Sequence, residues 1–228
     1  MKTTKLVTLF IASAFALSSC SNDETLTVPN ENAALLKTFK VKRDASGAYS
    51  TEFETNSNVK VDKVTNQDVN EFHLYESDFE SFQKQSEELF IDGNKLSVSF
   101  IDTNTDKKPY ISIEDDNITL AKSNSMLKEY SVSSGQEGSV NLAFNVSPQV
   151  TVDFVYNEDD NIYEIHLEKG KSTNTSFSRN LTKLEGEVLK IDFINHTDDT
   201  SAKTILAKEL IKRRKPRILV GNGEEVED

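Results

Sequence analysis

Phe39-Lys40-Val41-Lys42, in which apolar and charged residues alternate, is the first of the short segments that decide the fold. Val59-Lys60-Val61 and Phe72-His73-Leu74-Tyr75 repeat this alternation. Side chains along a β-strand point to opposite faces in turn, so a period of two predicts strands with one buried face. Clusters of Asn, Asp, Gly and Ser separate the runs, as turns do. The pattern therefore predicts a mainly β globular domain over residues 35–228, either an antiparallel β-sandwich or a barrel-like domain, with one or two short helices.

The first predicted helix covers about residues 78–90 and should pack on a sheet. Ser77 and Glu80 form a capping box at its start. Its apolar residues fall near one helical face: Tyr75, Phe79, Phe82, Leu89 and Phe90.

A second helix is predicted after Asp198-Asp199-Thr200, and it would end at Pro216. Its apolar positions are Ala202, Ile205, Leu206, Leu210 and Ile211. The basic run from Lys212 to Arg217 is interpreted as the solvated end of this helix. Ile218-Leu219-Val220 would form a final strand, followed by a frayed acidic tail from Gly221.

Two features indicate internal repetition. The sequence Glu-Asp-Asp-Asn-Ile occurs at 114–118 and at 158–162, and each copy predicts the turn of a hairpin. In addition, a Gly is followed six or seven residues later by a Phe at four places about 45 residues apart: Gly47 and Phe53, Gly93 and Phe100, Gly138 and Phe144, Gly186 and Phe193. A decayed four-fold β-unit would produce this spacing, and so would the ordinary placement of Gly in turns and Phe in strands.

Composition disfavours several classes of function. The 228-residue chain has a formal net charge of -12 at pH 7, which opposes binding to nucleic acid and to anionic membrane surfaces. The absence of Trp disfavours a carbohydrate-binding platform of flat aromatic rings. Cys20 is the only cysteine, so no disulfide and no Cys-ligated metal cluster can form within the chain.

The N-terminal residues have the parts of a secretory signal. Lys2 and Lys5 supply a charged region, and Leu6 to Leu17 is an uncharged apolar run. This run is too short to span a bilayer, which needs about 20 apolar residues.

Leu17-Ser18-Ser19-Cys20 resembles the lipobox of bacterial lipoproteins, in which diacylglycerol is attached to the cysteine sulfur. The resemblance implies a signal peptide over residues 1–19 and lipidation of Cys20. Residues 20–34 would then form a flexible tether between the lipid and the domain. The acyl chains would anchor the protein to a membrane.

Ser21-Asn22-Asp23-Glu24 follows the cysteine, and this region is similar to that of the surface-exported lipoproteins of the Bacteroidota. In that group an acidic cluster after the cysteine directs the protein to the outer face of the outer membrane. The resemblance implies a lipid-anchored protein of the cell outer membrane, exposed on the surface or facing the periplasm.

Asp102, Asn104 and Asp106 have the alternate oxygen ligands of a calcium loop and are the candidate metal ligands. An EF-hand needs Gly and Glu where this chain has Lys107 and Ile113, so a structural turn is the alternative interpretation.

The three histidines are His73, His166 and His196. His73 and His166 alternate with apolar residues, which predicts that both face solvent. His196 is interpreted as a loop residue. Some surface lipoproteins of the Bacteroidota carry haem between two histidines, so the resemblance also admits a haem carrier.

The sequence contains no complete catalytic motif, and no catalytic residue or cofactor is predicted. The leading hypothesis is a lipid-anchored cell-envelope protein with a non-enzymatic binding or scaffolding β-domain. Its partners would be the membrane, through the lipid, and an envelope protein or an extracellular ligand, but not nucleic acid. The alternatives are a carboxylate-based hydrolase and a carrier of a small ligand or metal, namely haem or calcium.

Overall fold

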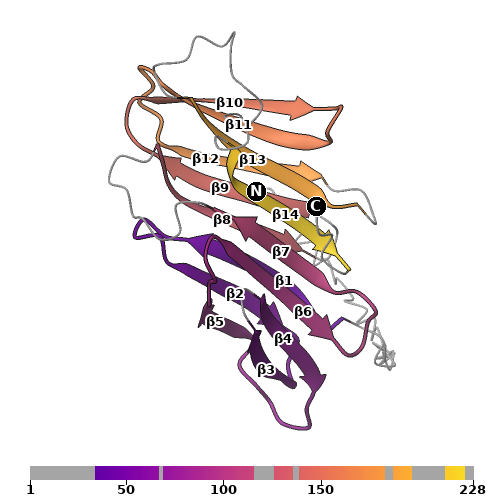
Figure 1. Ribbon diagram of the computed structural model, residues 1–228. Coiled ribbons are helices and arrows are strands. Elements are labelled where there is room, and N and C mark those ends of the chain that lie inside the picture. The colour runs from indigo at the N-terminus through magenta and orange to yellow at the C-terminus, as the bar shows by residue number, and fades with distance from the viewer. Residues whose placement is uncertain are drawn as a thin grey trace, which may run out of the picture. The chain divides into compact units, whose positions relative to one another are not determined.

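The computed structural model describes residues 34–66, 69–115, 126–135, 139–182, 187–196 and 214–223. Over these ranges the chain forms strands and turns and contains no helix, which confirms the prediction of a mainly β protein (Figure 1).

The strands belong to two sheets. Sheet A consists of β1 (Leu36–Arg43), β2 (Tyr49–Thr55), β5 (Lys84–Glu88), β8 (Leu127–Gly135), β9 (Ser139–Val146) and β12 (Ser176–Thr182). Sheet B consists of β3 (Val59–Asn66), β4 (Val69–Glu76), β6 (Lys95–Asp102), β7 (Pro109–Glu114), β10 (Val150–Asn157), β11 (Ile162–Lys169), β13 (Leu189–His196) and β14 (Arg214–Asn222). In space the orders are β12-β9-β8-β1-β2-β5 and β10-β11-β13-β14-β7-β6-β4-β3.

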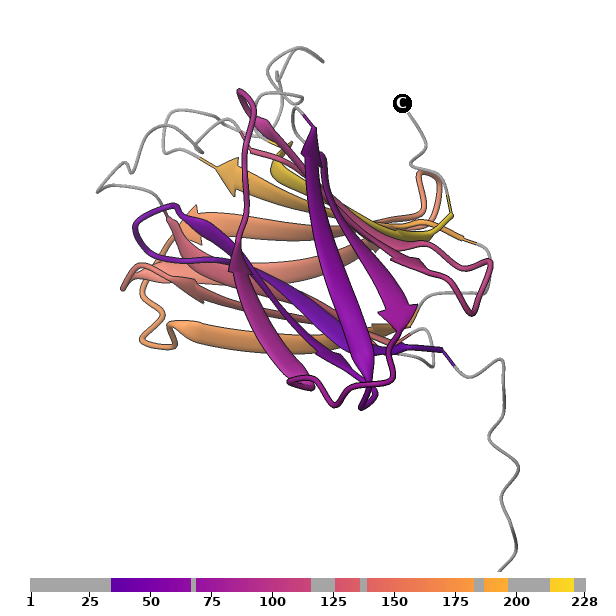
Figure 2. The ribbon, with the colours of Figure 1, turned by 90° about the horizontal axis from the view of Figure 1, so that it is seen from below.

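The two sheets face each other across one hydrophobic core (Figure 2). The ring of Phe100 in sheet B lies 4.8 Å from that of Phe39 and 5.3 Å from that of Phe53, both in sheet A. Each sheet keeps two edge strands, and part of the chain winds between the sheets as a β-solenoid of about four turns. The barrel-like alternative is therefore wrong. The pairing is also not wholly antiparallel, because β4 with β6 and β11 with β13 are parallel.

The two halves of the chain have the same topology. Strands β1–β7 and β8–β14 each visit the sheets in the order A, A, B, B, A, B, B. In the first half Phe72 of β4 lies opposite Phe100 of β6, and in the second half Ile165 of β11 lies opposite Phe193 of β13, 93 positions later. Figure 1 shows the two halves one above the other.

A pseudo-twofold axis relates these halves. In sheet A, antiparallel β1 and β8 pair with Val41 opposite Val132. These two residues correspond to each other, 91 positions apart, so the pairing is symmetric about them. In sheet B, β7 and β14 pair in the same way about Ser112 and Leu219. The fold is thus a duplicated unit joined across the centre of both sheets.

Because of the duplication, the Phe residues of the 45-residue spacing occupy equivalent positions in the two halves. Phe53 contacts Phe100 with ring centroids 5.3 Å apart, and Phe144 contacts Phe193 at 5.2 Å, each pair edge to face across the core. The structural repeat is therefore the half-chain unit, about twice the predicted length. Of the glycines in the spacing, Gly138 and Gly186 lie outside the described residues.

The helix predicted over residues 78–90 is wrong, because Lys84–Glu88 forms β5 and pairs with β2. Phe79 and Phe82, expected on the packed face, are 80% and 87% exposed. The hydroxyl of Ser77 accepts a hydrogen bond from the amide of Phe79 at 3.2 Å, a local turn and not a helix cap. A short isolated helix is marginally stable in water, whereas the open edge of β2 lets this segment form backbone hydrogen bonds within sheet A, which explains the outcome.

The C-terminal prediction is confirmed in one part and wrong in another. Ile218-Leu219-Val220 lies in a strand, β14, but this strand is central in sheet B and continues through Gly221 to Asn222, where a frayed tail was predicted. The predicted helix positions 202–211 lie outside the described residues.

The basic run is not a solvated helix end, because residues 214–217 belong to β14. Lys215 is buried and forms an ion pair with Glu114, and Arg217 binds Asp192 at 3.0 Å. Pro216 lies inside the strand beside an irregularity in the pairing with β13, where its missing N–H removes no regular ladder bond.

One of the two predicted hairpin turns is confirmed. β10 and β11 form a hairpin whose turn includes Asn161 with a φ of 54°, a conformation that Asn tolerates. In the other copy, Asp115 is not an exposed turn residue, since its side chain is buried beside Arg43. The remainder of that copy, 116–118, lies outside the described residues.

Candidate functional site

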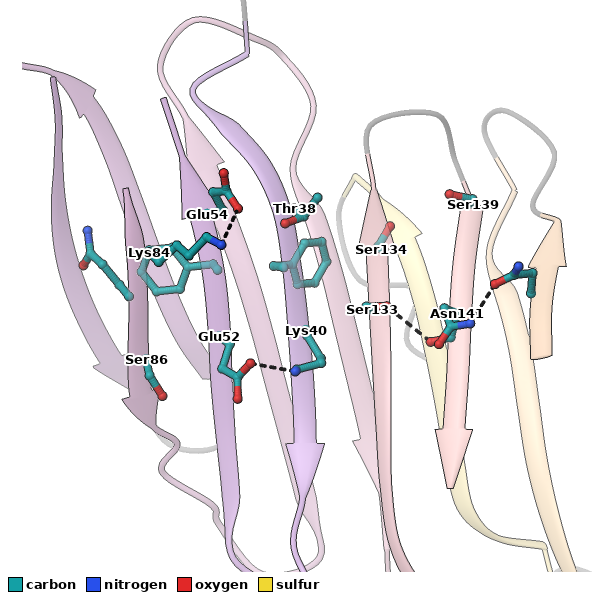
Figure 3. Close-up of a pocket in the computed structure, with 14 residues that line it drawn as sticks. Thr38, Lys40, Glu52, Glu54, Lys84, Ser86, Ser133, Ser134, Ser139 and Asn141 are labelled. Atoms are coloured by element: carbon teal, nitrogen blue, oxygen red, sulfur yellow. Dashed lines mark hydrogen bonds and ion pairs between the residues drawn. The ribbon is translucent and has the colours of Figure 1, made fainter. Parts of the chain in front are cut away.

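The outer face of sheet A carries a row of polar side chains that crosses every strand of the sheet (Figure 3). The strand registers place the members of this row opposite one another. From one edge of the sheet to the other, the members are Ser86, Glu52, Lys40, Ser133, Asn141 and Asn180. They come from β5, β2, β1, β8, β9 and β12, so the row follows the period of two in each strand.

This row forms the floor of an open groove with a volume of about 670 Å³. At one end the Nζ atom of Lys40 lies 2.6 Å from Oε2 of Glu52, and Lys84 lies 3.8 Å from Glu54. At the other end the groove is lined by uncharged groups, and the amide of Asn141 donates to the Oδ1 atom of Asn180 at 2.6 Å. The groove therefore offers ion pairs at one end and hydroxyls and amides at the other.

The two ends of the groove differ in charge, although the pseudo-twofold axis relates the strands that form them. Glu52 and Glu54 on β2 correspond, 91 positions later, to Ala143 and Asn145 on β9. Between them, Phe53 corresponds to Phe144, and both are buried in the core. The two halves thus keep an aromatic residue inside and differ on the outer face.

The candidate calcium ligands lie on one loop but have other partners. Asp102 is buried, and its Oδ2 atom accepts hydrogen bonds from the backbone amides of Leu35 at 2.6 Å and Leu36 at 3.4 Å. Its Oδ1 atom accepts from the amide of Asn104, whose side chain donates to Glu76 at 2.7 Å. Asp106 is exposed. In this arrangement Asp102 holds the start of β1 against the end of β6.

The structure brings two histidines together that are 30 positions apart in the sequence. His196 is the last residue of β13 and not a loop residue, and its Nε2 atom lies 2.8 Å from Nδ1 of His166. His73 and His166 lie on outer strand faces as predicted, with their side chains 25% and 23% exposed. The contact of His166 with His196 depends on the parallel pairing of β11 and β13, which no local pattern reveals.

A buried polar cluster lies between the sheets near the ends of β1 and β7. The hydroxyl of Tyr49 donates to Asp115 at 3.1 Å and lies 2.7 Å from the hydroxyl of Tyr130, and Arg43 lies 3.3 Å from Asp115. Burial raises the pKa of Tyr49 and of Tyr130 well above the usual range of a tyrosine. This cluster has a structural role, because it is closed to solvent.

Sequence reasoning missed the residues of the groove. The signal was a group of four neighbouring outward positions in β8 and β9 that carry no charge in a strongly charged chain: Ser131, Ser133, Asn141 and Ala143. Only the registers show that these positions join a continuous row.

Among the described residues no three His, Cys, Asp or Glu side chains gather as a ready metal-binding group. The same residues include no helix long and apolar enough to cross a membrane. Cys20 and the acidic residues Asp23 and Glu24 lie outside the described ranges.

Searches of models of protein families, of curated proteins and of solved structures find no match to this chain.

Proposed function

We propose that this chain is a lipid-anchored protein of the cell envelope whose β-domain binds an extended polar partner on the outer face of sheet A. The observation that carries the proposal is the row of six polar side chains across that face. With neighbouring strands about 4.8 Å apart, the row is about 24 Å long. This length fits an oligomeric or macromolecular ligand better than a small metabolite.

The chemistry of the groove supports binding without catalysis. Its floor offers hydrogen-bond donors and acceptors, and its carboxylates Glu52 and Glu54 each lie against a lysine. The groove is open, unlike the enclosed pocket that a small ligand needs. A binding or scaffolding role follows from this combination.

The anchor is supported by the sequence Leu17-Ser18-Ser19-Cys20. Two or more acyl chains would hold the protein on the membrane permanently. The segment of residues 20–34 would then separate the lipid from the start of β1 at Leu36.

A crosslinking experiment on intact cells tests the binding face. Once Cys20 is acylated the chain has no other thiol, so Asn141→Cys introduces a unique attachment point for a photoreactive group within the groove. Lys60→Cys on β3, whose side chain is 63% exposed on the other sheet, is the matched control. We expect a covalent adduct with an envelope component from position 141 and none from position 60. No adduct at either position, or equal adducts at both, would contradict the proposal.

Membrane fractionation tests the anchor. Cys20→Ser should leave the protein unprocessed or soluble, whereas the native protein should partition into detergent. Release of the native protein by high salt alone would rule out a covalent lipid.

A further inference from the structure

His166 and His196 form a close pair on the outer face of sheet B. They lie on the adjacent parallel strands β11 and β13, with His166 opposite Ile194 and His196 opposite Glu168. Their rings are stacked with centroids 5.1 Å apart and an interplanar angle of 16°. The Nδ1 atom of His166 lies 2.8 Å from the Nε2 atom of His196, so one nitrogen of each ring faces the other ring.

A carboxylate sets the orientation of the first ring. Nε2 of His166 lies 3.1 Å from Oε2 of Glu164, whose side chain is 10% exposed, and Asn157 donates to Oε1 of the same carboxylate at 3.3 Å. When the Nε2–H group of neutral His166 donates to Glu164, its Nδ1 atom carries a lone pair directed at His196. A histidine whose second nitrogen donates to a carboxylate is the usual arrangement of a metal ligand.

We propose that His166 and His196 together bind a divalent transition-metal ion such as Zn²⁺. Two zinc–nitrogen bonds of about 2.0 Å in tetrahedral geometry hold the nitrogens about 3.3 Å apart. The pair needs to open by only about half an ångström to admit the ion. On binding, the Nε2 proton of His196 moves to Nδ1 of the same ring by exchange with solvent, so that the ring stays neutral and both facing nitrogens can ligate.

Two carboxylates are strand neighbours of the histidine pair. Asp153 of β10 lies opposite His166, and Glu168 lies opposite His196, both exposed. The two imidazoles supply two ligands, and water fills the remaining positions of the ion. Imidazole nitrogen selects Zn²⁺, Cu²⁺ or Ni²⁺ over Ca²⁺, which prefers oxygen ligands.

The first half of the molecule contains residues that correspond to this histidine site, and they serve as an internal control. His73 and Glu71 of β4 correspond to His166 and Glu164, 93 positions later, and they also pair, at 3.4 Å. The position that corresponds to His196 is Thr103, whose hydroxyl donates to the carbonyl of Leu74. This half therefore has the oriented histidine but lacks the second imidazole.

Isothermal titration calorimetry with Zn²⁺ tests the site on the full-length untagged protein, purified in detergent. The chain has only three histidines, so each can be removed in turn: His166→Ala, His196→Ala and the control His73→Ala. His196→Gln keeps a hydrogen-bonding group beside His166 and serves where His196→Ala fails to fold. A parallel titration with Ca²⁺ tests selectivity, and Cu²⁺ gives an electron paramagnetic resonance spectrum that reports bound nitrogen.

We expect one Zn²⁺ per chain, lost in both His166 and His196 variants and unchanged in His73→Ala. Glu164→Gln should weaken binding about 10- to 100-fold, as the loss of an orienting partner does. The Cu²⁺ spectrum should show splitting by two nitrogens in the native protein and in His73→Ala. Absence of saturable Zn²⁺ binding, equal binding by the His166 variant, or equal loss in His73→Ala would overturn the proposal.

Discussion

The two ends of the pseudo-symmetric core differ at the scale of single residues. At one end these residues are Arg43, Asp115, Tyr49 and Tyr130. The four side chains form a buried polar cluster at one end. At the corresponding positions the other half has Ser134 for Arg43, Val140 for Tyr49 and Phe39 for Tyr130. There, Phe39 and Ser134 line an open pocket of about 230 Å³, whose lining also includes Asp102. A buried charge requires all its partners, so the cluster is sensitive to any change in protonation.

Alkaline pH should unfold the protein through Tyr49 and Tyr130. Their pKa values are raised by burial above the ordinary 10.0, so the folded state keeps both hydroxyls protonated while the unfolded chain loses the protons. The contribution to stability is complete below pH 10 and falls above it, by about 1.4 kcal/mol per pH unit for each tyrosine. Urea unfolding between pH 9 and 12 measures this slope.

The double variant Tyr49→Phe, Tyr130→Phe is the control for this prediction. Its free energy of unfolding should depend less steeply on pH above 10, whatever its value at pH 7. Equal slopes in the native protein and the variant would show that neither tyrosine is protected by the fold.

At the scale of elements, the close contact of β7 with β14 explains a glycine in a central strand. Gly221 lies opposite Tyr110, and a Cβ atom at Gly221 would lie 2.3 Å from Cε1 of the tyrosine ring. The ring of Tyr110 thus covers the backbone of the neighbouring strand, and no other residue fits at position 221 without displacement.

Gly221→Ala should therefore destabilise the protein by about 1–3 kcal/mol, the usual cost of overpacking a core. Chemical denaturation measures the change. In a Tyr110→Ala background the same substitution should cost much less, because the clashing ring is absent. If the cost of Gly221→Ala were the same in both backgrounds, the contact with Tyr110 would not be its cause.

At the scale of the whole molecule, the structure consists of two equivalent halves that share one core. The halves meet at β1 with β8 in sheet A and at β7 with β14 in sheet B. Buried residues of both halves belong to one continuous hydrophobic cluster. Each half thus completes the sheets of the other, as two subunits do in a symmetric dimer.

The two halves should remain associated after the chain is cut between them. A protease recognition sequence inserted between residues 120 and 121 lies outside every described strand. After cleavage we expect one peak in gel filtration at the position of the intact protein, since both interfaces and the shared core persist. Elution of the fragments as separate species would show that the halves are independent domains.

The sequence by itself determined the class of the fold and the place of many strands. Alternation at Phe39–Lys42, Val59–Val61 and Phe72–Tyr75 placed segments of β1, β3 and β4 correctly, because a period of two exists within one strand and needs no partner. It also placed Ile218–Val220 in a strand. The lipid anchor at Cys20 and the outer-membrane location stay predictions.

Only the tertiary structure decided the rest. Residues 84–88 became a strand because β2 offered an open edge, which outweighed helical spacing in a short segment. The groove row and the contact of His166 with His196 depend on registers between strands far apart in the chain. The length of the repeated unit stayed hidden because many corresponding positions, such as Phe72 and Ile165, share burial but not identity. Packing requires apolar volume and not a particular residue, so three-dimensional position preserved a repeat that the sequence shows only in part.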